Sequence, residues 1–111
     1  MSKAVRKQLL QKIELLEKGT KKSEELIIET RINDCIDMLM DCQDLAIAIG
    51  TYIEKLYGIG TQMVSVLEDY CEKLYAVAEQ VQQEETIGDC VAALDESMHG
   101  IRVAFEREFQ D

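Results

Sequence analysis

The stretch 28–56, IETRINDCIDMLMDCQDLAIAIGTYIEKL, carries the most regular hydrophobic pattern in the chain. Its apolar residues recur in alternating steps of four and three, which places their side chains along one stripe of an α-helix. They are Ile28, Ile32, Cys35, Leu39, Cys42, Ala46, Ile49, Ile53 and Leu56. The pattern predicts a long central helix on which the other segments pack.

Local signals before this stretch predict a separate helix and a turn. Lys18 and Gly19 form a common helix stop, because a cation suits the helix C-terminus and glycine accepts the left-handed conformation. Ser23 is a good N-cap for the next helix. The elements predicted here are a helix over 2–18, a turn over 19–22 and a helix over 23–57.

The second half of the chain also contains helix stop and start signals. Gly58 and Gly60 end the long helix, and Thr61 can cap the next one. The segment 86–89 resembles a capping box. These signals predict helices over 61–83 and 86–110.

Together these elements predict an all-α protein that forms one domain over residues 1–111. The absence of proline favours long helices. We expect an antiparallel bundle of four helices with coiled-coil spacing. The alternative is three long helices with a short basic N-terminal helix.

A weak internal repeat allows another position for the first turn. Shifting the chain by 55 residues superposes 34–36 on 89–91 and Leu39 on Leu94. The repeat suggests two similar helical hairpins and places the first turn near Glu29 and Thr30. The local stop signals favour 19–22 instead.

Charge is distributed unevenly along an acidic chain of net charge −10. Residues 1–22 carry seven basic and two acidic side chains, a net +5, and the remainder carries five basic and 20 acidic ones, a net −15. Such a chain repels nucleic acid and anionic membranes, so neither is an expected partner. The basic N-terminal helix is expected to lie on the acidic bundle, within one chain or across a dimer. As an alternative, it contacts a membrane or an acidic partner.

Cysteine usage and the N-terminus indicate a cytoplasmic protein. The chain starts with a charged amphipathic segment, which does not resemble a secretory leader, and it lacks an apolar run of the roughly 20 residues that span a bilayer. Its thiols are therefore expected to stay reduced. Cys35, Cys42, Cys71 and Cys90 lack the C-x-x-C spacing of structural zinc sites, so they are expected to be small core residues.

One pair of residues has metal-ligand spacing. Glu96 and His99 form an E-x-x-H on a predicted helix, as in carboxylate-bridged di-iron bundles. His99 is the only histidine, so such a site would need two chains. No catalytic motif, cofactor or metal is predicted, and the chain is not expected to be an enzyme. A metal-binding or ligand-binding bundle is the competing hypothesis.

The central helix has more apolar surface than one core requires. Its surplus apolar residues are Met38, Met40, Leu45 and Ile47, and its polar strip consists of Asp34, Asp37, Asp41 and Asp44. Methionines suit adaptable contact surfaces, and the acidic strip suits a basic helix, such as the N-terminal helix of a neighbour. We expect a small adaptor, regulatory or scaffolding subunit that self-associates through this helix, as a dimer, or binds a protein partner.

Two resemblances are consistent with a helical protein. The segments 45–61 and 67–75 resemble a family of small acidic helical proteins of clostridia-like bacteria, which implies a helical fold in a bacterial cytosol and no particular activity. The segments 57–60 and 75–79 resemble the W-x-G turn and the Y-x-x-x-D/E signal of type VII secretion proteins, although the tryptophan is missing. That resemblance implies a secretion-associated helical hairpin.

Overall fold

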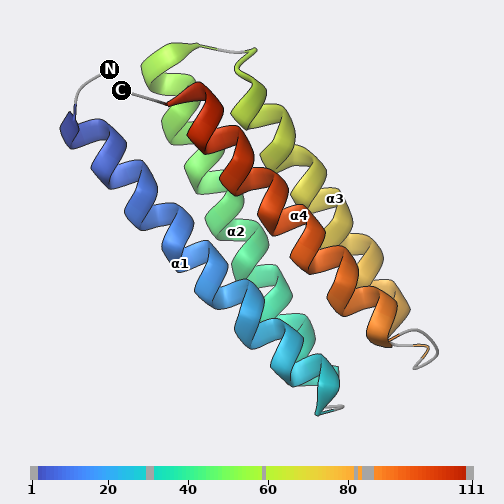
Figure 1. The fold of residues 1–111 in the computed structure, drawn as a ribbon. Helices are drawn as coiled ribbons and strands as arrows, with labels where there is room; N and C mark the ends of the chain where they lie inside the picture. The colour runs from blue at the N-terminus through green and yellow to red at the C-terminus, as the bar shows by residue number, and fades with distance from the viewer. Residues whose placement is uncertain (1–2, 30–31, 59, 82, 84–86, 110–111) are drawn as a thin grey trace.

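A computed structural model describes residues 3–29, 32–58, 60–81, 83 and 87–109, with the backbone alone over 32–34. Within these ranges the chain forms α-helices joined by short connections (Figure 1). The helices are α1 (Lys3–Ile28), α2 (Ile32–Tyr57), α3 (Gln62–Val81) and α4 (Ile87–Glu108).

The helices pack side by side as an antiparallel four-helix bundle, as the sequence predicts. Each helix packs against two neighbours: α1 and α3 both contact α2 and α4, so α1 lies diagonally across the bundle from α3. The bundle measures 44 × 21 × 20 Å. Short connections between consecutive helices impose this up-and-down topology.

The predicted turn at 19–22 is wrong, because α1 continues through it to Ile28. Ser23 is not an N-cap: its hydroxyl lies inside the bundle and donates to the carbonyl of Gly19, 2.9 Å away and one turn back. The chain reverses between Ile28 and Ile32, where the internal repeat places the turn. The predicted helices over 2–18 and 23–57 are therefore Lys3–Ile28 and Ile32–Tyr57.

With the corrected boundaries, α2 is not the long central helix predicted from the sequence. Helices α1 and α2 have 26 residues each, or about 39 Å at 1.5 Å per residue, so neither projects beyond the bundle. This length also excludes the alternative with a short N-terminal helix. Helix α2 is one of four equivalent packing elements and not a central one. None of the described helices is long and apolar enough to cross a membrane.

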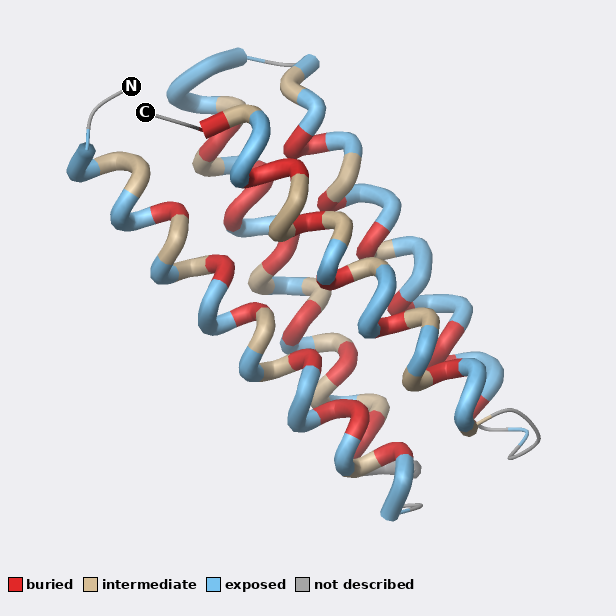
Figure 2. The backbone as a smooth tube through the Cα atoms, viewed as in Figure 1, coloured by how far each residue is buried: buried red, intermediate tan, exposed pale blue. Residues whose placement is uncertain are grey.

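The predicted apolar stripe of α2 forms part of the core. Its members from Cys35 to Ile53 are all buried, whereas Leu56, near the helix end, is 44% exposed. The stripe's first member, Ile28, belongs to α1 and is 62% exposed. Buried positions follow each helix along the side that faces the bundle axis (Figure 2). The predicted period therefore identifies the core face correctly, except at its ends.

The connection between α2 and α3 uses the residues that the sequence indicates. Gly58 and Gly60 have φ angles of 83° and 106°, a conformation that favours glycine. The Thr61 hydroxyl accepts a 3.4 Å hydrogen bond from the Val64 amide, as an N-cap does. The Glu108 carboxylate of α4 also accepts hydrogen bonds from the first amides of α3 and so connects the two helices.

Candidate functional site

The apolar residues predicted for an interaction surface divide between core and surface. Met40 and Leu45 are half-buried and pack against the core, and Met38 is also half-buried. Ile47, by contrast, is 54% exposed. Of these four side chains, Ile47 is the one that α2 leaves mostly accessible to a partner.

The predicted acidic strip lies on the outside of α2. Asp37, Asp41 and Asp44 are exposed, as their positions opposite the core stripe require. Asp34 belongs to α2, and its side chain lies outside the described residues. The strip gives the outer side of α2 a negative charge.

A groove of about 240 Å³ lies between α2 and α3, and Ile47 is one of the residues that line it. Ala46 and Gly50 give the α2 side of the groove small residues, and Leu67 lines it from α3. Carboxylates lie in its wall on both helices: Glu54 on α2 and Glu68 on α3. The groove is therefore apolar within and acidic at its edge.

Polar side chains cross the core at the level of Thr20. The Thr20 hydroxyl donates to the Leu16 carbonyl, 2.8 Å away, and contacts the hydroxyl of Tyr70. Because Tyr70 comes from α3, this contact joins the diagonal pair of helices. Ser23 contacts the thiol of Cys42 on α2 at 3.8 Å. Burial raises the pKa of Tyr70, so its phenol stays protonated and can donate.

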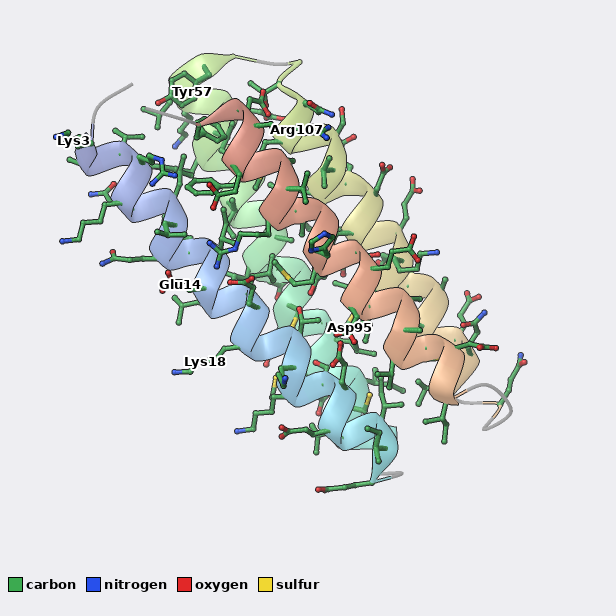
Figure 3. All side chains as sticks on the ribbon, viewed as in Figure 1. Lys3, Glu14, Lys18, Tyr57, Asp95 and Arg107 are labelled. Atoms are coloured by element: carbon green, nitrogen blue, oxygen red, sulfur yellow. The ribbon has the colours of Figure 1, made fainter. Side chains whose placement is uncertain are left out.

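A carboxyl pair lies between α1 and α4. Glu24 on α1 is only 8% exposed, and its Oε1 has no hydrogen-bond partner. Burial, followed by the hydrogen bond and the charge of Asp95 on α4, raises the pKa of Glu24 from 4.5 to about 8. Glu24 is therefore mainly protonated at neutral pH. Figure 3 shows Asp95 on the part of α4 that faces α1.

Glu24 and Asp95 line a groove of about 270 Å³ between α1 and α4. Thr20 and Met98 line its inner part. Towards the other end, Arg102 of α4 forms two hydrogen bonds with the Glu17 carboxylate, at 2.6 and 3.3 Å. The groove thus contains the Glu24–Asp95 carboxyl pair, in which Glu24 Oε1 has no hydrogen-bond partner, and the Arg102–Glu17 ion pair.

The predicted metal-ligand pair does not converge on one site. Glu96 lines a groove between α3 and α4, whereas His99 is exposed and lines the groove between α1 and α4. Among the described residues, no group of three or more His, Cys, Asp or Glu side chains is placed to hold a metal ion.

The cysteines are core and boundary residues. Cys35, Cys42 and Cys90 are buried, Cys71 is half-buried, and none of the four is in a disulfide. Burial raises the pKa of Cys35 to about 11 and also raises the pKa values of Cys42 and Cys71. Few thiolates therefore form at these positions at neutral pH, which makes them poor nucleophiles.

The burial of Thr20 and Ser23 of α1 was not predicted from the sequence, although the spacing of the apolar residues indicates it. The steps of four and three that connect Leu9, Ile13 and Leu16 continue to Thr20, Ser23 and Ile27. Extending the stripe through the glycine would have placed Thr20 and Ser23 inside the bundle. Asp95, 71 residues after Glu24, carries no local signal of its role.

Comparisons of the chain with protein-family models, curated proteins and solved structures found no match. The function is therefore argued from the geometry of the bundle.

Proposed function

We propose that the chain is a protein–protein interaction module whose α2–α3 groove binds a basic amphipathic helix of a partner in the bacterial cytoplasm. The main supporting observation is Ile47, which is 54% exposed beside a groove bordered by Glu54 and Glu68. A bulky apolar side chain of the partner would fill the groove, and neighbouring lysines or arginines would meet the carboxylates.

The charge around the groove decides the kind of partner. The chain has a net charge of −10, and Asp44 adds to the carboxylates near Ile47. A basic helix would gain electrostatic attraction during encounter and docking, whereas an acidic helix would be repelled. Binding should therefore weaken as salt concentration rises.

The same charges bear on the predicted self-association through α2. Two copies that met through their α2 helices would place the strips of Asp37, Asp41 and Asp44 against each other. The outer side of α1 instead carries Leu15, which is 57% exposed and lines a surface pocket together with Lys18 and Lys22. Figure 3 labels Lys18 on α1. If a second copy is the partner, we propose that it binds through this side of α1.

The binding test uses a synthetic amphipathic helix of leucine and lysine, labelled for fluorescence anisotropy, and a matched leucine–glutamate peptide. The wild-type chain should bind the basic peptide and not the acidic one. Ile47→Glu should weaken binding about tenfold, the equivalent of about 1.4 kcal/mol. Native mass spectrometry of the unlabelled chain, with and without peptide, reports both self-association and complex stoichiometry.

The matched control is Ala92→Glu, at an exposed position of α4. Both variants add one negative charge, so non-specific attraction of the basic peptide would strengthen equally in both. If the peptide docks at the groove, Ile47→Glu should weaken binding, whereas Ala92→Glu should not. Stronger or unchanged binding by Ile47→Glu would contradict the proposed site.

A further inference from the structure

The groove between α1 and α4 contains a buried acceptor that the fold leaves unused. Glu24 is only 8% exposed, which means that more than nine-tenths of it is buried, and its Oε1 has no hydrogen-bond partner. An unpaired buried carboxyl oxygen destabilises the fold, because its hydration is lost without replacement. A ligand that donates a hydrogen bond to Oε1 would recover part of this cost.

The neighbourhood of Glu24 favours a cation as that ligand. Asp95, an exposed residue of α4, lines the same groove as Glu24, and its hydrogen bonding and negative charge contribute to the raised pKa of Glu24. Two carboxyl groups at one site cannot both ionise without a compensating positive charge. The charged and titratable groups that the structure places around Glu24 are Glu17, Lys21, Glu25, Asp95, His99 and Arg102.

The basic groups in the groove do not pair with this oxygen. Arg102 is held by Glu17 at 2.6 Å. Lys21 lowers the pKa of Glu24 through its charge, yet no hydrogen bond reaches Oε1. Glu24 is mainly protonated at neutral pH, and when it ionises no basic group of the chain is hydrogen-bonded to Oε1, so a cation from solvent would stabilise the ionised pair.

The donor set distinguishes between kinds of cation. Within the described residues, no three His, Cys, Asp or Glu side chains are arranged around a metal position. An ammonium group needs only two or three acceptors for its N–H bonds, and Glu24 with Asp95 supplies them. Met98, Lys21 and Arg102 also line the groove, and the apolar parts of such side chains suit a short alkyl chain.

We propose that the α1–α4 groove binds a small primary amine, with its ammonium group between the carboxylates of Glu24 and Asp95 and its alkyl chain along Met98. The groove volume of about 270 Å³ admits an amine of a few carbon atoms. This site is independent of the α2–α3 groove and uses none of its residues.

Binding at this site is linked to pH. The amine requires the ionised form of Glu24, whose pKa in the unliganded chain is about 8. Binding therefore releases a proton to solvent at neutral pH, and affinity should rise by up to tenfold per pH unit until about pH 8. Well above that pH the amine loses its own proton, at a pKa near that of lysine, about 10.4.

The test is an NMR titration of the ¹⁵N-labelled chain with propylamine at about pH 8.5. Propylamine should shift the amide signals of Thr20, Glu24, Asp95 and Met98 in a saturable manner. Propanol, which has the same shape without the charge, should not. Glu24→Gln should weaken binding at least tenfold, whereas Glu14→Gln, at an exposed position of α1 outside this groove, should leave it unchanged.

Three results would overturn the proposal. The first is the absence of saturable shifts for the wild-type chain at pH 8.5, and the second is equal propylamine affinity for Glu24→Gln and the wild type. The third is a stronger response of the same signals to calcium chloride, which would assign the carboxyl pair to a metal ion. Circular dichroism of Glu24→Gln checks that the variant is folded, and the pH dependence of the wild-type titration tests the site without any substitution.

Discussion

Glu24 is a buried ionisable residue whose Oε1 lacks the hydrogen bonds that its buried polar neighbours form. Its neighbours on the inner side of α1 are Thr20, Ser23 and Ile27, which are buried, and Thr20 and Ser23 bond to carbonyls of their own helix. Glu24 has no such partner for Oε1 and lies against Asp95. Its raised pKa is the direct consequence, because the protonated form avoids both an unpaired charge and repulsion.

This raised pKa predicts that the bundle loses stability as pH rises. Glu24 has a pKa of about 8 in the folded chain and an ordinary value of 4.5 when unfolded. Between these values the folded chain holds more protons than the unfolded one, so the free energy of unfolding falls with rising pH, by at most about 1.4 kcal/mol per unit. Above about pH 8 this contribution is fully lost.

The measurement is urea unfolding at several pH values between about 5 and about 9. Glu24→Gln should flatten the decline, and its stability relative to the wild type should increase with pH. Glu14→Gln, at an exposed position of the same helix that does not contribute to the pKa shift of Glu24, should keep the wild-type slope. If the Glu24→Gln and wild-type curves run parallel, the pKa of Glu24 is not raised.

At the level of the helices, the regular spacing of apolar residues was a better guide than single stop signals. The stripe of α2 predicted the buried residues from Cys35 to Ile53. Gly19 and Ser23 predicted a turn, but packing against α2 and α4 keeps α1 helical through both. Local signals of this kind are weak, about 1 kcal/mol each, and burial of a helix face outweighs them. The internal repeat used long-range information and therefore placed the turn correctly.

Gly19 has a packing role that its sequence context hides. A Cβ at this position would lie 3.0 Å from the Sγ of Cys42, which is only 3% exposed. A Cβ at Gly100 of α4 would meet nothing within 4 Å. Alanine is a better helix former than glycine by about 0.5–1 kcal/mol, so the two positions should respond differently.

We predict that Gly100→Ala raises the free energy of unfolding by about 0.5–1 kcal/mol, and that Gly19→Ala lowers it, because overpacking costs about 1–3 kcal/mol. Combining Gly19→Ala with Cys42→Ala removes the close contact, so in that background the glycine substitution should become stabilising. Chemical denaturation of Gly100→Ala, Gly19→Ala, Cys42→Ala and the double variant measures each effect. A stabilising Gly19→Ala in the wild-type background would show that α1 and α2 can separate slightly at no cost.

For the whole molecule, the sequence predicted the bundle but not the groups that meet across it. Glu24 and Asp95 come from the first and last helices, and only the closed arrangement of α1 against α4 brings them together. Glu96 and His99, which are close in sequence, point into different grooves. Residues within one helix can be assigned to a face from their spacing, whereas contacts between helices depend on which helices are neighbours.

The net charge of −10 on a bundle 44 Å long predicts an unusual response to salt. Raising the salt concentration from about 0.01 M to about 0.1 M shortens the screening length from about 30 Å to about 10 Å. Repulsion between carboxylates across the bundle is then screened, while close ion pairs such as Arg102–Glu17 lose little. The free energy of unfolding should therefore rise, by about 1 kcal/mol.

Thermal or urea unfolding over this range of sodium chloride concentrations measures the effect. A triple variant with Asp37, Asp41 and Asp44 changed to asparagine has a net charge of −10 + 3 = −7 and keeps the α1–α4 ion pairs, so its stability should depend less on salt. A fall in wild-type stability with salt would show that attraction within the α1–α4 seam outweighs the repulsion over the rest of the surface. In that case Arg102→Gln, which removes the pairing with Glu17 and leaves the carboxylate repulsion in place, would weaken or reverse the fall in stability with salt.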